Sequence, residues 1–442
     1  MSRSDTALRY FEEHRGYTEE RIAYGISQHR KGRGTVTVTD REGKPLAGVT
    51  LRLVLKNHEF RHGANIFMLE EMESKEKNDL YKDKFAQVFN LATVPFYWSD
   101  LEPIEGQPRY AKDSPKIYRR PATDLCVEFC EEKGIEPKCH CLNYDLFLPN
   151  WLWGKSVEEQ KASLVRRFRE IAQRYAHRIP SFEVTNETFA PHFDSPNCSA
   201  FFHEDDFVEW SFRQADRFFP NNRLIINDYA LFDGFYRGNR SAYYMQIERM
   251  NRMGIRCESV GMQFHSFFPR EEEVKMAQTR YNPLHLYRVL DTYAKLGKKL
   301  QITEMTLSAY GDSTEDEQVQ AELLRWVYSV FFSHPAMEAI IYWNLVDGYA
   351  AFAPKGDMTA GENRFYGGLL RFDMSEKPAF RTLYDLFHRE WHTDVTLVTD
   401  RDGRATLDGF YGVYDVVAEG EGIHYRGEAS YSSTGRQIRL TL

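Results

Sequence analysis

The 442-residue sequence has no long apolar run and no excess of positive charge. No stretch approaches the roughly 20 apolar residues that a transmembrane helix needs. With a formal net charge of −8, the chain offers little attraction to phosphate backbones or anionic lipids. We therefore expect neither nucleic acid nor a membrane as a partner.

The N-terminus lacks the apolar core of a signal peptide. A polar start runs directly into the charged segment Glu12–Arg15. We expect a cytoplasmic protein, and a secreted chain whose leader had been removed would look the same. The sequence carries no signal for an oligomeric state.

The six cysteines contain no CxxC pair and suggest no disulfide framework in a chain of this length. Cys139 and Cys141 flank His140, but alternate residues of a strand point to opposite faces, so both thiols face away from that imidazole. Cys126 and Cys130 have a spacing that permits a shared helix face. We expect no metal ion and no other cofactor.

A glycine-rich phosphate loop is also missing after the early strands, which argues against a doubly wound nucleotide-binding sheet. What is present is an alternation of β-rich and helical runs, the helical ones including 156–176 and 315–332. Eight such repeats predict an α/β fold of the (β/α)8 TIM barrel type over residues 60–390. The expected strands are His62–Phe67, Phe89–Val94, Glu136–Leu142, Ser181–Glu187, Leu224–Asn227, Ser259–Phe264, Leu300–Glu304 and Ala339–Asn344.

The two ends of the chain differ from the middle. Residues 1–30 are predicted to form an N-terminal helix, whereas 31–59 and 391–442 contain short alternating runs separated by turns. These runs predict an accessory β-sandwich built from both termini. We interpret it as structural, with carbohydrate binding as the alternative.

Polar residues gather where the predicted barrel strands end. In a barrel, the carboxyl ends of the strands form the face that carries chemistry. Six strands share this feature, which core packing alone does not explain. The residues are His140, Asn186, Glu187, Asn227, Asp228, Gln263, His265, Glu304, Trp343 and Asn344.

Two of these residues are glutamates that end buried β-rich runs, Glu187 after Ser181–Asn186 and Glu304 after Leu300–Thr303. A pair of carboxylates on different strands is the minimum equipment of a retaining glycoside hydrolase. The expected spacing of the two carboxyl groups is about 5–5.5 Å. Surface carboxylates at strand ends are the alternative.

Several motifs in order resemble the family 10 glycoside hydrolases, mostly β-1,4-xylanases, across about residues 60 to 390. The segment 182–187, Phe-Glu-Val-Thr-Asn-Glu, is similar to the family's Trp-Asp-Val-Val-Asn-Glu, and 302–305 to its Ile-Thr-Glu-Leu. The segments 138–142 with 148–152, 261–265, 225–229 and 98–103 resemble further family motifs. The resemblance implies a retaining mechanism without a cofactor, acting on an oligo- or polysaccharide or another glycoside.

The sequence also departs from the family's motifs, at the positions that hold the glycone, which is the sugar whose anomeric bond is cut. The family's Glu-Asn pair and lysine after strand 2 are absent from 93–98, where Tyr97 stands at the lysine position. Its Trp-His after strand 3 reads Tyr144-Asp145, and its Asp two residues after the nucleophile is Thr306. Its late tryptophan in Asp-x-Tyr-Ser-Trp is replaced within 347–351. A site that loses its polar partners discriminates against its former substrate, so ordinary xylan is not the expected preference.

The resemblance implies that Glu304 is the nucleophile and Glu187 the general acid/base. Asn186 would bond the 2-hydroxyl of the sugar. The full set of expected substrate-binding residues is Tyr97, His140, Tyr144, Asn186, Tyr229, Gln263, His265 and Trp343.

Three functions stay open from the sequence. The first is an endo-xylanase relative with altered specificity. The second is an exo-acting β-glycosidase on short oligosaccharides or on aryl or natural-product glycosides. The third is a sugar-binding barrel that no longer catalyses, although such a protein has no need of both glutamates.

Overall fold

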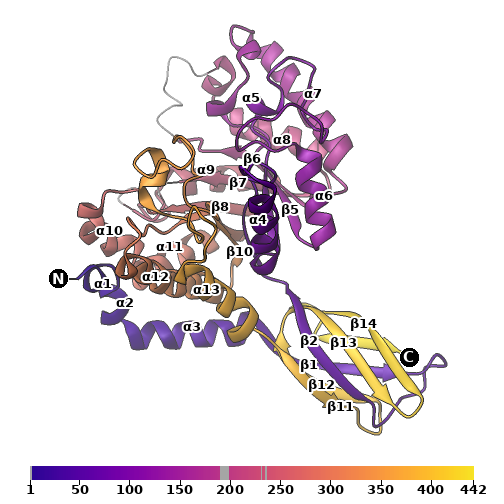
Figure 1. The fold of residues 1–442 in the computed structure, drawn as a ribbon. Coiled ribbons are helices and arrows are strands. Elements are labelled where there is room, and N and C mark those ends of the chain that lie inside the picture. Colours follow the sequence, from indigo (N-terminus) through magenta and orange to yellow (C-terminus); the bar gives the residue numbers. More distant parts are fainter. Residues whose placement is uncertain (1, 190–198, 230, 234–235) are drawn as a thin grey trace.

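The computed structural model describes residues 2–189, 199–229, 231–233 and 236–442. Its centre is a closed barrel of eight parallel strands in the order β10-β3-β4-β5-β6-β7-β8-β9. Helices surround the barrel, and the strands of both chain ends form two small sheets beside it (Figure 1). The predicted fold class, a TIM barrel with accessory β-strands from both termini, is confirmed.

All eight predicted barrel strands are present, with ends that lie within two residues of the expected ones. Their bounds are β3 Arg61–Asn65, β4 Leu91–Pro95, β5 Glu136–His140, β6 Ser181–Asn186, β7 Arg223–Asp228, β8 Ser259–His265, β9 Lys299–Thr306 and β10 Met337–Tyr342. Nearly all of these residues are buried on both faces, as expected for parallel strands under a layer of helices.

The outer helices form where apolar residues recur at helical spacing. In α7 (Val157–Tyr175), a capping box of Ser156 and Glu159 starts the helix. Leu164, Phe168 and Ile171 then face the barrel. The other helices are α4 Lys75–Val88, α5 Trp98–Leu101, α6 Thr123–Lys133, α8 Phe207–Phe218, α9 Ala242–Arg252, α10 Glu273–Arg280, α11 Pro283–Ala294, α12 Thr314–Ser333 and α13 Pro378–Asp385.

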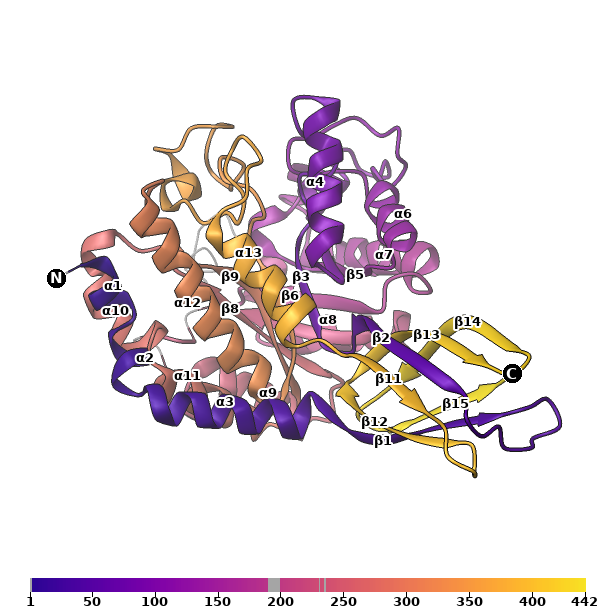
Figure 2. The same ribbon diagram turned by 60° about the horizontal axis from the view of Figure 1, so that its bottom comes forward.

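The N-terminal segment is not one helix as expected from the sequence but three, α1 (Arg3–Ala7), α2 (Arg9–Glu13) and α3 (Arg15–His29). The breaks fall at Leu8 and His14, where ψ is near 0° or positive. Anchoring explains the break, because Arg3 is buried against α10 and α12 while α3 runs beside α12 (Figure 2). Gly25 permits that contact, since a Cβ there would meet the Ser333 carbonyl at 2.3 Å.

The terminal strands form one sheet of order β12-β1-β15 and another of order β11-β2-β13-β14. Strand β2 leads into the barrel after two residues, since β2 ends at His58 and β3 begins at Arg61. The bounds are β1 Lys31–Thr39, β2 Thr50–His58, β11 Asp394–Val398, β12 Arg404–Phe410, β13 Gly412–Gly420, β14 Ile423–Tyr431 and β15 Gln437–Thr441. The division of the chain at residues 30, 59 and 390 and the role of these sheets stay predictions.

In the part of the chain that the structure describes, no helix is both long and apolar enough to cross a bilayer. Over the same residues, no group of three or more His, Cys, Asp or Glu side chains could hold a metal ion. Five cysteines are free and buried. Cys198 lies outside the described residues.

Candidate active site

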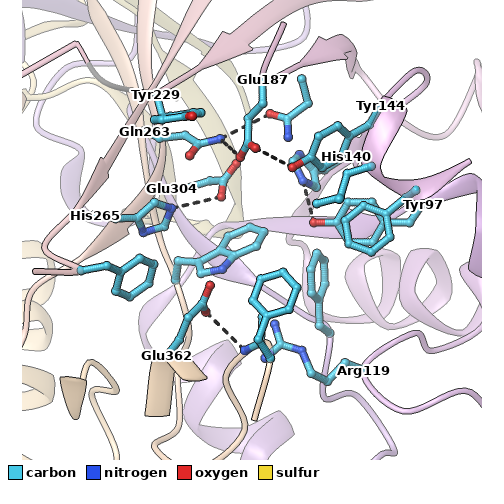
Figure 3. Close-up of a pocket in the computed structure, with 18 of the residues that line it drawn as sticks. Tyr97, Arg119, His140, Tyr144, Glu187, Tyr229, Gln263, His265, Glu304 and Glu362 are labelled. Carbon is cyan, nitrogen blue, oxygen red and sulfur yellow. Dashed lines mark hydrogen bonds and ion pairs between the residues drawn. The ribbon is translucent and has the colours of Figure 1, made fainter. Parts of the chain in front are cut away.

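A cavity of about 470 Å³ opens at the carboxyl ends of the barrel strands (Figure 3). All ten residues predicted for the site line it: Tyr97, His140, Tyr144, Asn186, Glu187, Tyr229, Gln263, His265, Glu304 and Trp343. Asn227, Asp228 and Asn344, which also end strands, do not line it. Seven of the ten lining residues came from the strand-end pattern, and Tyr97, Tyr144 and Tyr229 came from the family resemblance.

The two glutamates face one another across this cavity (Figure 3). Glu304 lies in β9, and Glu187 is the first residue after β6. Glu187 has a φ of +51°, which is uncommon for a residue with a side chain and occurs where the surroundings impose it. Its backbone N–H donates to the Asn227 carbonyl at 3.0 Å, which fixes the turn that aims the carboxylate.

Glu187 receives a hydrogen bond on each carboxylate oxygen. The Tyr144 hydroxyl donates to Oε2 at 2.5 Å, and Nε2 of Gln263 donates to Oε1 at 2.8 Å. The two donors come from opposite walls of the cavity and hold the carboxylate in one orientation. Such preorganisation is what a proton-transferring group needs.

Glu304 is buried and contacts two polar side chains. Nδ2 of Asn227 donates to Oε1 at 3.0 Å, and Nε2 of His265 lies 3.2 Å from Oε2. Burial raises the pKa of Glu304 to about 8; His140 acts against this rise and the negative Glu187 adds to it. The resting site therefore favours a proton on or beside Glu304.

The hydrogen bonds around His265 show where that proton is held. The Thr306 hydroxyl donates its single proton to the Trp343 carbonyl, so its oxygen can only accept from Nδ1 of His265, at 3.0 Å. Burial lowers the pKa of His265 to about 4, which leaves a neutral ring with a bare Nε2. Because Nε2 and a Glu304 oxygen face each other, one proton must be shared by this pair.

Asn227 links Glu304 to Asn186, the residue that precedes Glu187. Its Nδ2 donates both to Glu304 and to Oδ1 of Asn186 at 2.7 Å, and its own Oδ1 accepts from the Thr303 hydroxyl. The side chain is fully buried. Gly261 makes room for it, since a Cβ at that position would lie 2.6 Å from Oδ1 of Asn227.

Both ring nitrogens of His140 contact other side chains of the protein. Nδ1 contacts Glu183, which also pairs with Lys138 inside the barrel, and Nε2 lies 2.9 Å from the Tyr97 hydroxyl. Burial opposes ionisation of Glu183, but Lys138 and His140 outweigh it and hold its pKa below the usual range. His140 therefore orients Tyr97 at the cavity wall.

The cavity also contains residues that sequence reasoning missed. They lie beyond the strand ends, most of them in loops or short 3-10 turns and Arg280 at the end of α10, where no strand pattern marks them. Among them are Phe67, Arg119, Arg120, Phe147, Asp233, Phe267, Phe268, Arg280, Phe352 and Glu362. The aromatic richness of the composition was the one available signal, and it does not say which rings face the cavity.

Comparison with known sequences identifies the family of this chain. The family model of Glycosyl hydrolase family 10 matches residues 57–385. The chain is 22% identical over 378 residues to Endo-1,4-beta-xylanase 2 of Arabidopsis thaliana, which covers 84% of this chain and 31% of that protein. It is 23% identical over 319 residues to the Beta-1,4-xylanase of Dictyoglomus thermophilum, covering 64% of this chain and 84% of that protein. The chain thus spans about a third of the length of the Arabidopsis relative.

Known structures share the barrel. Native xylanase 10B from Thermotoga maritima matches with a TM-score of 0.59 at 22% identity, over 75% of this chain and 96% of that one. Xylanase 10B from Thermotoga petrophila RKU-1, in complex with xylobiose, matches with a TM-score of 0.58 at 21% identity, over 75% and 95% of the two chains. These likenesses show a common fold, and the family match over most of the sequence confirms the resemblance seen in the motifs: the chain belongs to glycosyl hydrolase family 10.

Proposed function

We propose that this protein is a retaining glycosidase that cleaves β-glycosidic bonds with Glu304 as nucleophile and Glu187 as general acid/base. The observation that carries the proposal is the position of these two carboxylates, which come from different strands and face one another in one cavity. Each is held by donors that do not contact the other, Tyr144 and Gln263 for Glu187 and Asn227 for Glu304.

The first step requires charged Glu304 and a Glu187 that has taken up a proton. Glu304 attacks the anomeric carbon while Glu187 gives that proton to the glycosidic oxygen, so the bond to the leaving group breaks and a glycosyl ester forms. In the second step, Glu187 removes a proton from water, whose oxygen attacks the anomeric carbon and releases Glu304. The hydrogen bond donated by Asn227 favours the charged form of Glu304.

The substrate we propose is a β-glycoside other than plain, unsubstituted xylan. The named relatives are xylanases, but Tyr97 stands at the position of the family's glycone-binding lysine and Tyr144 at that of its tryptophan. Tyr97 uses its hydroxyl on His140, and Tyr144 uses its hydroxyl on Glu187. A site changed in this way binds the former sugar less well.

A panel of aryl β-glycosides tests the proposal with wild type, Glu187→Ala and Glu304→Ala. We expect Glu304→Ala to abolish turnover. We expect Glu187→Ala to lower kcat by roughly 10²–10⁴-fold for poor leaving groups, and by less for leaving groups that need no protonation. Azide should restore turnover in Glu187→Ala and yield a β-glycosyl azide, because the small anion replaces water on the covalent intermediate.

Glu158→Ala is the matched control, since Glu158 is exposed on α7 away from the cavity. It should retain wild-type turnover. Undiminished activity of Glu304→Ala on every glycoside, in folded protein, would remove the nucleophile from the proposal. Binding of oligosaccharides without any turnover by wild type would favour the non-catalytic barrel instead.

A further inference from the structure

Arg119 closes one end of the cavity. It belongs to the segment 102–122 between α5 and α6, and its side chain is buried. Its Nη1 donates to the Tyr349 carbonyl, and its Nη2 donates to Oδ1 of Asn344 at 3.3 Å. Both acceptors follow β10. Because β3 lies between β4 and β10 in the barrel, Arg119 passes across the end of β3 and joins the loops on either side.

The segment that carries Arg119 is firmly held. Nε of Arg109 donates to the Pro115 carbonyl at 2.7 Å and its Nη2 to the Arg120 carbonyl at 3.2 Å, so Arg109 braces the segment from inside. Nζ of Lys116 donates to the Glu70 carbonyl at 2.7 Å. These contacts fix the segment 102–122, which therefore forms a rigid wall at this end of the cavity.

Arg120 fills the space next to Arg119. It pairs with Asp100 at 2.8 Å, and its guanidinium lies 4.2 Å from the centre of the Tyr97 ring and 5.3 Å from that of Phe147. Phe147 also stacks on Tyr97, with ring centres 4.1 Å apart. A chain of sugar rings that entered the cavity could not continue past Tyr97 on this side.

The closed end is the end for the glycone. Glu187 protonates the leaving oxygen, so the leaving group departs on its side of the cavity, beside Tyr229 and Gln263 (Figure 3). Arg119 and Glu362 lie at the opposite end, beyond Glu304 (Figure 3). The glycone must therefore occupy the part that Arg119 closes.

Glu362 gives this end a hydrogen-bond acceptor opposite the Arg119 donor. The carboxylate lines the cavity and accepts from the Ala351 backbone N–H at 3.2 Å. Arg119 and Glu362 attract one another electrostatically. A free sugar hydroxyl can accept from a guanidinium and donate to a carboxylate at once. In the interior of a polysaccharide, the equivalent oxygen is an ether, which donates nothing and carries a further sugar that would collide with the wall.

We propose that the cavity recognises the non-reducing end of a β-linked oligosaccharide, with Arg119 and Glu362 as the residues that make the enzyme exo-acting. The inference rests on the glycosidase activity proposed above and specifies its substrate class. The volume of about 470 Å³ supports it, since sites for single small molecules measure roughly 300–1,000 Å³, whereas an endo-acting enzyme needs a groove open at both ends.

The test uses the sugar that the aryl-glycoside panel identifies, as a hexasaccharide labelled at its reducing end, with samples taken early in the reaction. We expect wild type to remove units of one constant size, one after another, from the unlabelled end of the chain. No labelled mono- or disaccharide should appear early. We expect at least a 10-fold loss of kcat/KM when the terminal hydroxyl is methylated. Early mixed internal products, with equal rates on methylated and free chains, would overturn the inference.

Two variants probe the wall. Arg119→Ala should produce internal cleavage and reduce the discrimination against methylated ends. Glu362→Gln keeps the wall but weakens the acceptor, so it should raise KM for free ends with a smaller change in kcat, and it serves if Arg119→Ala does not fold. Arg364→Ala, in the same 3-10 helix as Glu362 but exposed and outside the cavity lining, is the matched control and should give the wild-type product pattern.

Failure of this inference is separate from failure of the proposed function. If no aryl β-glycoside is turned over, the activity itself is wrong. If aryl glycosides are turned over through Glu187 and Glu304 but oligosaccharides are cut internally, the activity stands and exo action is wrong.

Discussion

At the scale of single residues, Thr306 sets the hydrogen bonding beside the proposed nucleophile. Its hydroxyl proton goes to the Trp343 carbonyl. This hydrogen bond makes Nδ1 of His265 the donor and leaves Nε2 and Glu304 to share one proton. An anionic residue at position 306 would instead favour the doubly protonated ring and so the charged carboxylate.

Thr306→Asp should therefore extend activity to lower pH. A carboxylate beside His265 raises the imidazole pKa, which places the shared proton on His265 and lowers the pKa of Glu304 from about 8. The rate falls on the acid side where Glu304 becomes protonated, so that limb of the kcat/KM profile should move down by about 1 pH unit or more. Asparagine has nearly the shape of aspartate without its charge, so Thr306→Asn should leave the acid limb of the kcat/KM profile unshifted. Coincident acid limbs for wild type and Thr306→Asp would contradict the shared-proton interpretation.

Gly261 is the second residue with a predictable effect. A methyl group there would meet Oδ1 of Asn227 at 2.6 Å and Cγ2 of Thr303 at 2.8 Å. We expect Gly261→Ala to displace Asn227, to release its hold on Glu304 and so to lower kcat more than it changes KM. Overpacking should also reduce the free energy of unfolding by about 1–3 kcal/mol. Chemical denaturation and steady-state kinetics measure both effects.

The control for Gly261→Ala is the same change at Gly16. Apart from its own helix backbone and chain neighbours, no described atom lies within 4 Å of a Cβ at that position, and Gly16 is in the first turn of α3. Gly16→Ala should leave kcat unchanged and raise stability slightly, since alanine favours helix by up to about 1 kcal/mol. Wild-type kcat and stability in Gly261→Ala would show that the close approach has no consequence.

At the scale of elements, the short helix α1 depends on one buried cation. Arg3 pairs with Glu273 of α10 at 3.0 Å and donates to the Ser308 carbonyl at 2.6 Å and to that of Asp316 at 2.8 Å. It thereby ties the N-terminus to α10, to the start of α12 and to the segment that follows β9. Five residues of helix could not hold this position by propensity alone.

Removing the guanidinium should be costly because it leaves Glu273 buried without its partner. We expect Arg3→Met to lower the free energy of unfolding by about 3–5 kcal/mol, the usual effect of breaking a buried ion pair from one side. Urea denaturation followed by tryptophan fluorescence measures it. Arg9→Met, on exposed Arg9 of α2, is the control and should change stability by less than about 0.5 kcal/mol. Equal stabilities of the two variants would show that α1 is not anchored through Arg3.

Elements and site residues differed in how far the sequence predicted them. The barrel strands and seven of the ten lining residues were predictable because buried parallel strands are continuous apolar runs and their polar ends meet on one face. Tyr97, Tyr144 and Tyr229 came from the family motifs instead. The wall at Arg119 and the acceptor Glu362 were not predictable, because residues of loops and of a single 3-10 turn follow no periodic pattern and reach the site only through tertiary contacts. The breaks at Leu8 and His14 were hidden for a similar reason, since anchoring by Arg3 overrides local helix propensity.

At the scale of the whole molecule, a cluster of rings joins the terminal sheets to the barrel. His62 of β3 stacks on Phe387 with ring centres 3.6 Å apart, and Phe332 of α12 stacks on Trp391 at 4.0 Å. His58, at the end of β2, lies edge-on to His62. We call this cluster of His58, His62, Phe332, Phe387 and Trp391 the joint. Because both chain ends pass through the joint, its contacts decide whether the sheets and the barrel unfold together.

Acid should weaken the joint. Burial lowers the pKa of His58 to about 4 and that of His62 further below the usual value, and His388 adds to the effect on both. The unfolded chain takes up these protons near pH 6.5, so the unfolded state binds more protons than the folded one between about pH 6.5 and 4. Stability contributed by neutral His58 and His62 is therefore fully present above pH 6.5 and is lost as the pH falls through this window.

His62→Phe keeps a ring against Phe387 and removes the group that titrates. We expect its Tm to fall less than that of wild type between pH 7 and pH 5, measured by calorimetry in buffers of equal ionic strength. His424→Phe, on the exposed side of β14, leaves the joint intact and should follow wild type. If His62→Phe loses as much Tm as wild type over that range, protonation of His62 is not the source of the acid sensitivity.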